Sequence, residues 1–179
     1  MRLFVSIDLP GEVQEKLDGW LPALPDLRYT KKEQLHLTLL FLGESDEGEA
    51  NLIAKRLGAI QFEPFDMVIE GVGAFPSRTN PRVFWAGVKK NIELIRLQKQ
   101  ISEKLSGFVD DGGNDSFKPH ITLARATKQF RLKRSEKLFE NEESIFLKVA
   151  SVSLKKSILS QEGSTHTVLK TFYADRKHS

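Results

Sequence analysis

Apolar and polar residues alternate in several short segments of the chain, and this pattern predicts strands. Segments 3–10, 65–75 and 82–88 show it most clearly, with Pro10 ending the first. Side chains in a strand point alternately to the two faces of a sheet, so each segment would have one apolar face. Residues 144–159 and 164–174 are rich in β-branched residues and are predicted as two further strands.

Other segments space their apolar residues at intervals of three and four, which predicts helices. They cover residues 12–21, 46–60, 91–108 and 135–143. In the helix over 91–108, the predicted apolar face consists of Ile92, Ile95, Leu97, Ile101 and Leu105. Helices and strands alternate, but several strands follow one another through short turns, which favours an α+β fold with largely antiparallel sheets.

Two strands interrupt an apolar run with a histidine and a threonine at the same spacing. The first is "LHLTLLFLG" (35–43) and the second is "PHITLAR" (119–125). By strand alternation, His36 and Thr38 share one face while the leucines between and beside them take the other. His120 and Thr122 repeat this arrangement about half a chain later, so a duplicated architecture would place one H-x-T motif in each of two similar lobes.

These side chains suit acid–base chemistry at a phosphodiester. Imidazole titrates near neutrality, so one histidine can serve as a general base while the other serves as a general acid. The hydroxyls of Thr38 and Thr122 can donate hydrogen bonds to phosphate oxygens, as can the guanidinium of Arg125. His166 and His178 lack the +2 threonine and are predicted to be structural or solvent-exposed.

A metal centre is the main chemical alternative. Zinc needs three or four protein ligands, whereas only two histidines share the predicted cleft. Asp110, Asp111 and Asp115 precede the second motif, but their spacing does not match an EF-hand loop. We therefore expect no metal and no cofactor.

Composition and charge narrow the setting of the protein. The 179 residues carry a net charge of +3 and no cysteine, which excludes disulfides and thiolate chemistry. Residues 118–134 contain six Lys or Arg and no acid, which suits an anionic ligand or a solvated face. Since the sequence has no secretory signal and no apolar stretch long enough to cross a bilayer, we expect a cytoplasmic protein that does not bind membranes.

The motifs and their surroundings resemble the 2H phosphoesterase superfamily. Within it the chain is most similar to the RNA 2′,3′-cyclic phosphodiesterase branch, also called 2′-5′ RNA ligase-like. The segments that carry the resemblance are "RLFVSIDLP", "LHLTLLFLG", "GVGAFPS", "PRVFWAGV", "FKPHITLAR", "VSLKKSIL" and "TFYA". It covers nearly the whole chain and implies one bilobal domain over 1–179, with two pseudo-symmetric lobes, each a mainly antiparallel sheet with helices outside, around a central cleft.

The resemblance also implies an activity and roles for single residues. The reaction would open the terminal 2′,3′-cyclic phosphate of RNA, such as tRNA halves, or of nucleotides to a 2′-phosphomonoester without metal, and the protein would be a monomer. His36 would be the proton donor and His120 the proton acceptor, although the symmetric motifs by themselves allow either order. Thr38, Thr122 and Arg125 would bind the phosphate.

The aromatic residues have less definite expectations. Phe4 is a candidate stacking partner for the terminal base, with a core position as the alternative. Trp85 and Phe117 are expected in the core or in the cleft wall. The last strand of the family often carries an aromatic residue after its glycine turn, where this chain has "GSTHTVL", so His166 is a candidate replacement.

Three other functions stay open from the sequence, and one of them is the opening of small cyclic phosphates such as ADP-ribose 1″,2″-cyclic phosphate. The same site could join 2′,3′-cyclic and 5′-hydroxyl RNA ends into a 2′-5′ bond, which is the reverse reaction with a hydroxyl in place of water. A non-catalytic nucleotide- or RNA-binding module could also keep the fold. Retention of both histidines and both threonines favours an enzyme.

Overall fold

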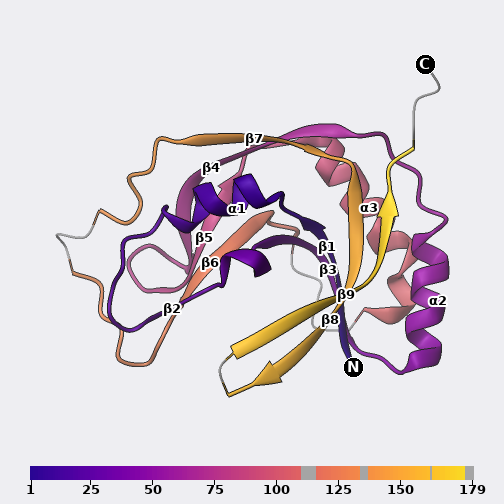
Figure 1. The fold of residues 1–179 in the computed structure, drawn as a ribbon, viewed down its shortest axis with the longest axis horizontal. Helices are drawn as coiled ribbons and strands as arrows, with labels where there is room; N and C mark the ends of the chain where they lie inside the picture. Colours follow the sequence, from indigo (N-terminus) through magenta and orange to yellow (C-terminus); the bar gives the residue numbers. More distant parts are fainter. Residues whose placement is uncertain (110–115, 134–136, 162, 176–179) are drawn as a thin grey trace.

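Two antiparallel sheets with helices packed against them make up the fold (Figure 1). The computed structural model describes residues 1–109, 116–133, 137–161 and 163–175. The first sheet has the strand order β3-β1-β8-β9 and the second has the order β2-β6-β5-β4-β7. The strands are β1 (Arg2–Asp8), β2 (Leu27–Tyr29), β3 (His36–Glu44), β4 (Phe65–Pro76), β5 (Pro81–Val88), β6 (His120–Ala126), β7 (Ser144–Val149), β8 (Ser151–Ser160) and β9 (Gly163–Tyr173). This arrangement confirms the predicted α+β class.

Each sheet contains one of the two H-x-T motifs, at the beginning of a strand. β3 starts at His36 in the first sheet, and β6 starts at His120 in the second. The residues between and after the motif positions are buried, including Leu37 in β3 and Ile121 in β6. The apolar faces predicted by strand alternation are therefore confirmed, and each motif strand is held by its buried face.

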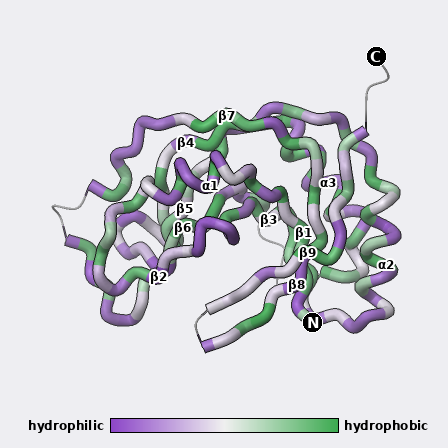
Figure 2. Tube along the Cα trace, in the orientation of Figure 1, coloured by the Kyte–Doolittle hydropathy of each residue, from purple (hydrophilic) through white to green (hydrophobic). Residues whose placement is uncertain are grey.

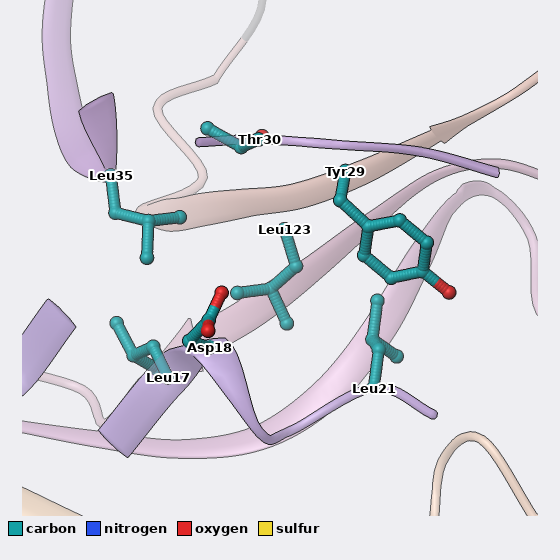
Figure 3. Close-up of a pocket in the computed structure, with 7 residues that line it drawn as sticks. All are labelled: Leu17, Asp18, Leu21, Tyr29, Thr30, Leu35 and Leu123. Atoms are coloured by element: carbon teal, nitrogen blue, oxygen red, sulfur yellow. The ribbon is translucent and has the colours of Figure 1, made fainter. Parts of the chain in front are cut away.

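Two helices cross from one sheet to the other. Each follows a strand of one sheet in the chain but packs on the other sheet. Within the described ranges, the α-helices are α1 (Gly11–Asp18), α2 (Glu47–Leu57) and α3 (Ile92–Lys104). α1 follows β1 of the first sheet, but Leu17 lies beside Leu123 of β6 around a space of only about 10 Å³ (Figure 3). α3 follows β5 of the second sheet, yet its Gln98 donates a hydrogen bond to the Leu39 carbonyl of β3 at 3.3 Å. Each motif strand is thus supported by a helix from the other side of the fold.

The buried face of α3 differs from the predicted one. Leu94, Leu97, Ile101 and Leu105 are buried, whereas Ile92 and Ile95 are 61% and 44% exposed. Apolar residues occur on more than one side of this helix, so the sequence does not decide which side packs on the first sheet. Hydrophobic and hydrophilic residues also alternate along α2 (Figure 2). None of the helices in the described ranges is both long and apolar enough to cross a membrane.

The strand predicted over residues 144–159 is two strands in different sheets. β7 pairs with β4 of the second sheet, and β8 pairs with β1 of the first sheet after a break at Ala150. No glycine or proline marks this break, and the residues on both sides of it are equally suited to strands. Only the choice of partner strand separates the two.

The prediction of a helix over 135–143 is wrong for residues 137–143, the part of this range that the structure describes. Residues 137–143 contain a turn at Leu138 and Phe139 and no helix. Leu138 is buried, and the ring of Phe139 stacks on Phe84 of β5 with centroids 6.1 Å apart. Both apolar side chains reach the core from this single turn, so no helical repeat is needed to bury them.

Candidate active site

His36 is oriented by a backbone carbonyl and by its motif partner. Its Nδ1 lies 2.7 Å from the Gln34 carbonyl oxygen, and its Nε2 lies 3.1 Å from Thr38 Oγ1. Because a carbonyl can only accept, Nδ1 carries the hydrogen. In the neutral ring Nε2 is therefore an acceptor, and the Thr38 hydroxyl donates to it.

His120 has the same backbone support. Its Nδ1 donates to the Lys118 carbonyl oxygen at 2.7 Å, which again makes Nε2 the acceptor of the neutral ring. The ring meets Phe75 edge-on, with centroids 5.0 Å apart, and Trp85 lies beside it at 6.3 Å. Trp85, half-buried in β5, is therefore a wall residue of the second motif, which agrees with the expectation for it.

One cavity of about 540 Å³ brings the two motifs together. Thr38 of the first motif and His120 of the second both line it. Phe117 is also in its wall, as the sequence allowed. The other lining residues come mainly from β3 and the segment before β6: Leu39, Leu40, Phe41, Phe75, Gln98, Val109, Ser116 and Lys118. The cavity thus joins one residue of each motif, whereas His36, Thr122 and Arg125 are not among the residues that line it.

Arg125 reaches the motif face because β6 is irregular. In a regular strand, residues an odd number apart point to opposite faces, which would separate Arg125 from His120. The register between β5 and β6 skips Leu123, so that Trp85 pairs with Thr122 and Val83 with Arg125. A bulge of this kind shifts the alternation by one residue. Directly paired residues share a face, and Arg125 therefore lies on the face of Thr122 and His120.

The first motif strand has a matching irregularity. Between β1 and β3 the register passes from Ser6–Thr38 to Val5–Leu40 and skips Leu39. The residue at the position equivalent to Arg125 is Phe41, which is 67% exposed and lines the cavity. The two halves of the site thus share a backbone design but differ in charge, with a cation on one side and an aromatic ring on the other.

A partly buried ion pair lies beside His36. Lys155 of β8 pairs with Asp8 of β1, and their side chains are 10% and 39% exposed. Asp8 is directly opposite His36 in the β1–β3 register and also accepts a hydrogen bond from the Ser153 hydroxyl at 2.7 Å. These residues place one positive and one negative charge next to the first motif.

The environment of His36 favours its neutral form. Burial lowers the pKa of His36 to about 4, and the positive charge of Lys155 and the neighbouring His166 act in the same direction. The Gln34 carbonyl and Asp8 oppose this shift without cancelling it. At pH 7 the free protein therefore holds His36 as a proton acceptor.

Replacing Lys155 with methionine should raise the pKa of His36. The substitution removes a nearby positive charge and leaves Asp8 unpaired, and both changes stabilise the imidazolium. We expect a rise from about 4 toward the ordinary value of about 6.5, but not the full difference, since the ring stays buried. NMR titration of the His36 ring measures this pKa. Lys156→Met is the matched control, and an unchanged pKa in Lys155→Met would contradict the electrostatic role of Lys155.

Phe4 supports His36 and does not offer a free ring. It is only 2% exposed, and its centroid lies 5.1 Å from His36 and 4.9 Å from His166. This corrects the stacking expectation in favour of the core alternative, since a base has no access to the ring. The exposed aromatic residue next to Phe4 is Phe41, and the centroids of the two rings are 6.2 Å apart.

His166 is half-buried beside the first motif, which agrees with the structural alternative of the expectation for it. Its ring meets His36 edge-on, with centroids 4.9 Å apart, and its Nε2 lies 2.8 Å from Ser164 Oγ. Burial and the charge of Lys155 lower the pKa of His166. It therefore occupies the place next to the first motif where an aromatic residue was expected. His178, Asp110, Asp111 and Asp115 lie outside the described residues.

Asp8 and Lys155 place charges beside His36, and the sequence did not reveal that they would. Asp8 lies near the end of the first predicted strand, and Lys155 is one of two adjacent lysines in "SLKKS". The available signal was alternation, because Ser153, Lys155 and Ser157 share the face opposite the buried Val152 and Leu154. Which strand that polar face would meet depended on the pairing of β8 with β1.

Comparison with known proteins gives a consistent result. The LigT-like phosphoesterase family matches residues 7–85, a range that includes the first motif. An RNA 2′,3′-cyclic phosphodiesterase of Archaeoglobus fulgidus is 38% identical over 178 residues, covering 96% of this chain and 99% of its own.

Solved structures extend this similarity to the fold. The protein TT0787 of Thermus thermophilus superimposes with a TM-score of 0.84 and 30% identity, over 99% of this chain and all of the other. LigT of E. coli, crystallised with 3′-AMP, superimposes with a TM-score of 0.81 and 26% identity over 98% of each chain. The likeness therefore spans both sheets.

Proposed function

The chain belongs to the LigT-like phosphoesterase family, and we propose that it opens 2′,3′-cyclic phosphate ends of RNA to 2′-phosphomonoesters. The observation that carries this proposal is the single cavity shared by Thr38 and His120, one from each motif. Both motif histidines carry their hydrogen on Nδ1, which leaves each Nε2 available for proton transfer. His120 lines this cavity, and His36 Nε2 lies 3.1 Å from the lining Thr38 hydroxyl, so the two rings can act on the two oxygens exchanged at phosphorus.

In the proposed reaction the two histidines have complementary roles. His120 Nε2 accepts a proton from water as the water oxygen bonds to phosphorus, and His36 gives a proton to the 3′-oxygen as its bond to phosphorus breaks. Thr38, Thr122 and Arg125 donate hydrogen bonds to the non-bridging oxygens, where negative charge accumulates. The 2′-ester bond stays intact, so the product carries a 2′-phosphate.

The donor role of His36 requires a change of protonation when substrate binds. Its pKa of about 4 keeps it neutral in the free protein at pH 7. A bound phosphodiester brings a negative charge next to Lys155 and His36, and this charge raises the pKa of His36. The reversed order, with His36 as the base, is the second candidate, and the neutral ring of the free protein favours it.

Cyclic-phosphate RNA incubated with the protein in EDTA tests the reaction. We expect complete turnover that the chelator does not reduce, and phosphorus NMR of the product should show a phosphate on the 2′-oxygen. The double variant His36→Ala/His120→Ala, prepared identically, controls for contaminating nucleases. Absence of turnover, a 3′-phosphate product, or loss of activity on chelation would each contradict the proposal.

A further inference from the structure

Two arginines face each other across the edge of the second sheet. Arg28 of β2 is directly opposite Arg125 of β6, and both are exposed. Among the described residues, neither forms an ion pair with a carboxylate. Like charges directly opposite each other destabilise a sheet. An anion bound beside them would compensate for this repulsion.

Arg28 lies on the same face as the second motif. In the antiparallel register, Val83 pairs with Arg125 and Arg125 with Arg28, so the three side chains form one row. The adjacent row contains Trp85 and Thr122. Arg28 therefore extends the motif face by one strand, or about 5 Å, beyond Arg125.

The neighbouring residue of β2 supports this orientation. Tyr29 pairs with Ala124, which is buried, and lies with Leu21 and Leu123 on the opposite side of the sheet (Figure 3). Successive strand residues point to opposite faces, so Arg28 points away from that packed side. The short strand β2 is held by its apolar face and presents a guanidinium beside Arg125.

We propose that Arg28 binds the phosphodiester that joins the terminal nucleotide to the rest of the RNA, so that the chain leaves the site across β2. This inference rests on the proposed function, in which Arg125 holds the reacting phosphate. A guanidinium makes paired, charge-assisted hydrogen bonds to phosphate oxygens, and contacts of this kind position a nucleic acid without reading its sequence. A mononucleotide lacks this second phosphate, so Arg28 would distinguish RNA ends from free cyclic nucleotides.

Three substrates separate the second phosphate from the second base. They are adenosine 2′,3′-cyclic phosphate, ApA ending in a 2′,3′-cyclic phosphate, and the same dinucleotide with a neutral methylphosphonate linkage. We expect Arg28→Ala to lower kcat/KM about tenfold for the dinucleotide with the charged linkage and to leave the other two unchanged. Arg28→Lys should retain part of the effect, because it keeps the charge but loses the planar fork.

The matched control is Arg82→Ala, which removes the same charge from β5 but from the opposite face to Val83. We expect it to leave the ratio between the charged and neutral dinucleotides unchanged. If Arg28→Ala lowers kcat/KM equally on all three substrates, Arg28 only supports Arg125 or the fold. If it lowers kcat/KM on none of them, Arg28 does not contact the second phosphate. Either result overturns the inference.

A binding measurement keeps this inference separate from the proposed reaction. ApA carrying a 2′-phosphate, with either linkage, is titrated into the wild type and Arg28→Ala, and the dissociation constants are compared. The wild type should prefer the charged linkage about tenfold, and the variant should not. If the wild type turns over none of the cyclic substrates but shows this preference, the proposed reaction fails and the Arg28 site stands. If binding is indifferent to the linkage, the Arg28 site fails regardless of turnover.

Discussion

Replacing either His36 or His120 with alanine should lower kcat on cyclic-phosphate RNA by about a thousandfold while the protein stays folded. General acid and general base catalysis each contribute about a hundredfold to ten-thousandfold to a rate, and each variant removes one of them. Both histidines lie on the face of their strand opposite to the buried side chains, so the core keeps its packing. Single-turnover kinetics and thermal unfolding measure the two effects separately.

The fourth histidine of the sequence provides the control. His178→Ala is the same chemical change at a position without the motif threonine, and it should keep full activity. Full activity in His36→Ala or His120→Ala would contradict the acid–base role of that residue. A similar loss in all three variants would indicate a general effect of histidine removal.

A substrate with sulfur in place of the bridging 3′-oxygen distinguishes the acid from the base. A thiolate leaves without protonation, so the general acid becomes unnecessary while the general base is still needed. We expect this substrate to restore most of the rate to His36→Ala and little of it to His120→Ala. The opposite pattern would exchange the two roles and agree with the neutral His36 of the free protein.

Acidification should destabilise the protein through His36 by about 3 kcal/mol between pH 7 and pH 4. The pKa of His36 is about 4 in the folded state, below the ordinary value of about 6.5 expected in the unfolded chain. The unfolded state therefore takes up this proton first as the pH falls. The stability associated with neutral His36 is fully present above pH 6.5 and is lost as the pH falls from there to about 4.

Urea unfolding of the wild type and His36→Gln at both pH values isolates this contribution. Carboxylates also titrate in this range, but they are common to the two proteins and cancel in the comparison. We expect the wild type to lose about 3 kcal/mol more than the variant on going from pH 7 to pH 4. An equal loss in both proteins would show that His36 is not held neutral by its surroundings.

Local patterns explain why much of the site could be predicted. Strand alternation placed His36 and Thr38 opposite the buried Leu37, and the same rule placed His120 opposite Ile121. This rule needs only neighbours in the chain, so it held for the motif residues of both strands. It failed for Arg125, because one skipped residue in the β5–β6 register moves this side chain to the other face.

The errors share a dependence on long-range packing. Ala150 separates strands of different sheets without any local signal. α3 has apolar residues on two sides, and only its contact with the first sheet decides that Leu94 is buried and Ile92 is not. Phe4 had an apolar ring of the right kind for stacking, but its neighbours from β3 and β9 cover it.

The sequence by itself determined the two H-x-T strands, their apolar faces and the α+β class, because these follow from side-chain periodicity within short segments. Only the tertiary structure decided what surrounds the motifs. Asp8, Lys155 and His166 reach His36 from three other strands, and Arg28 reaches Arg125 from an edge strand. Strand pairing brings these residues together across long stretches of sequence, so the electrostatics of the site belong to the fold and not to any local motif.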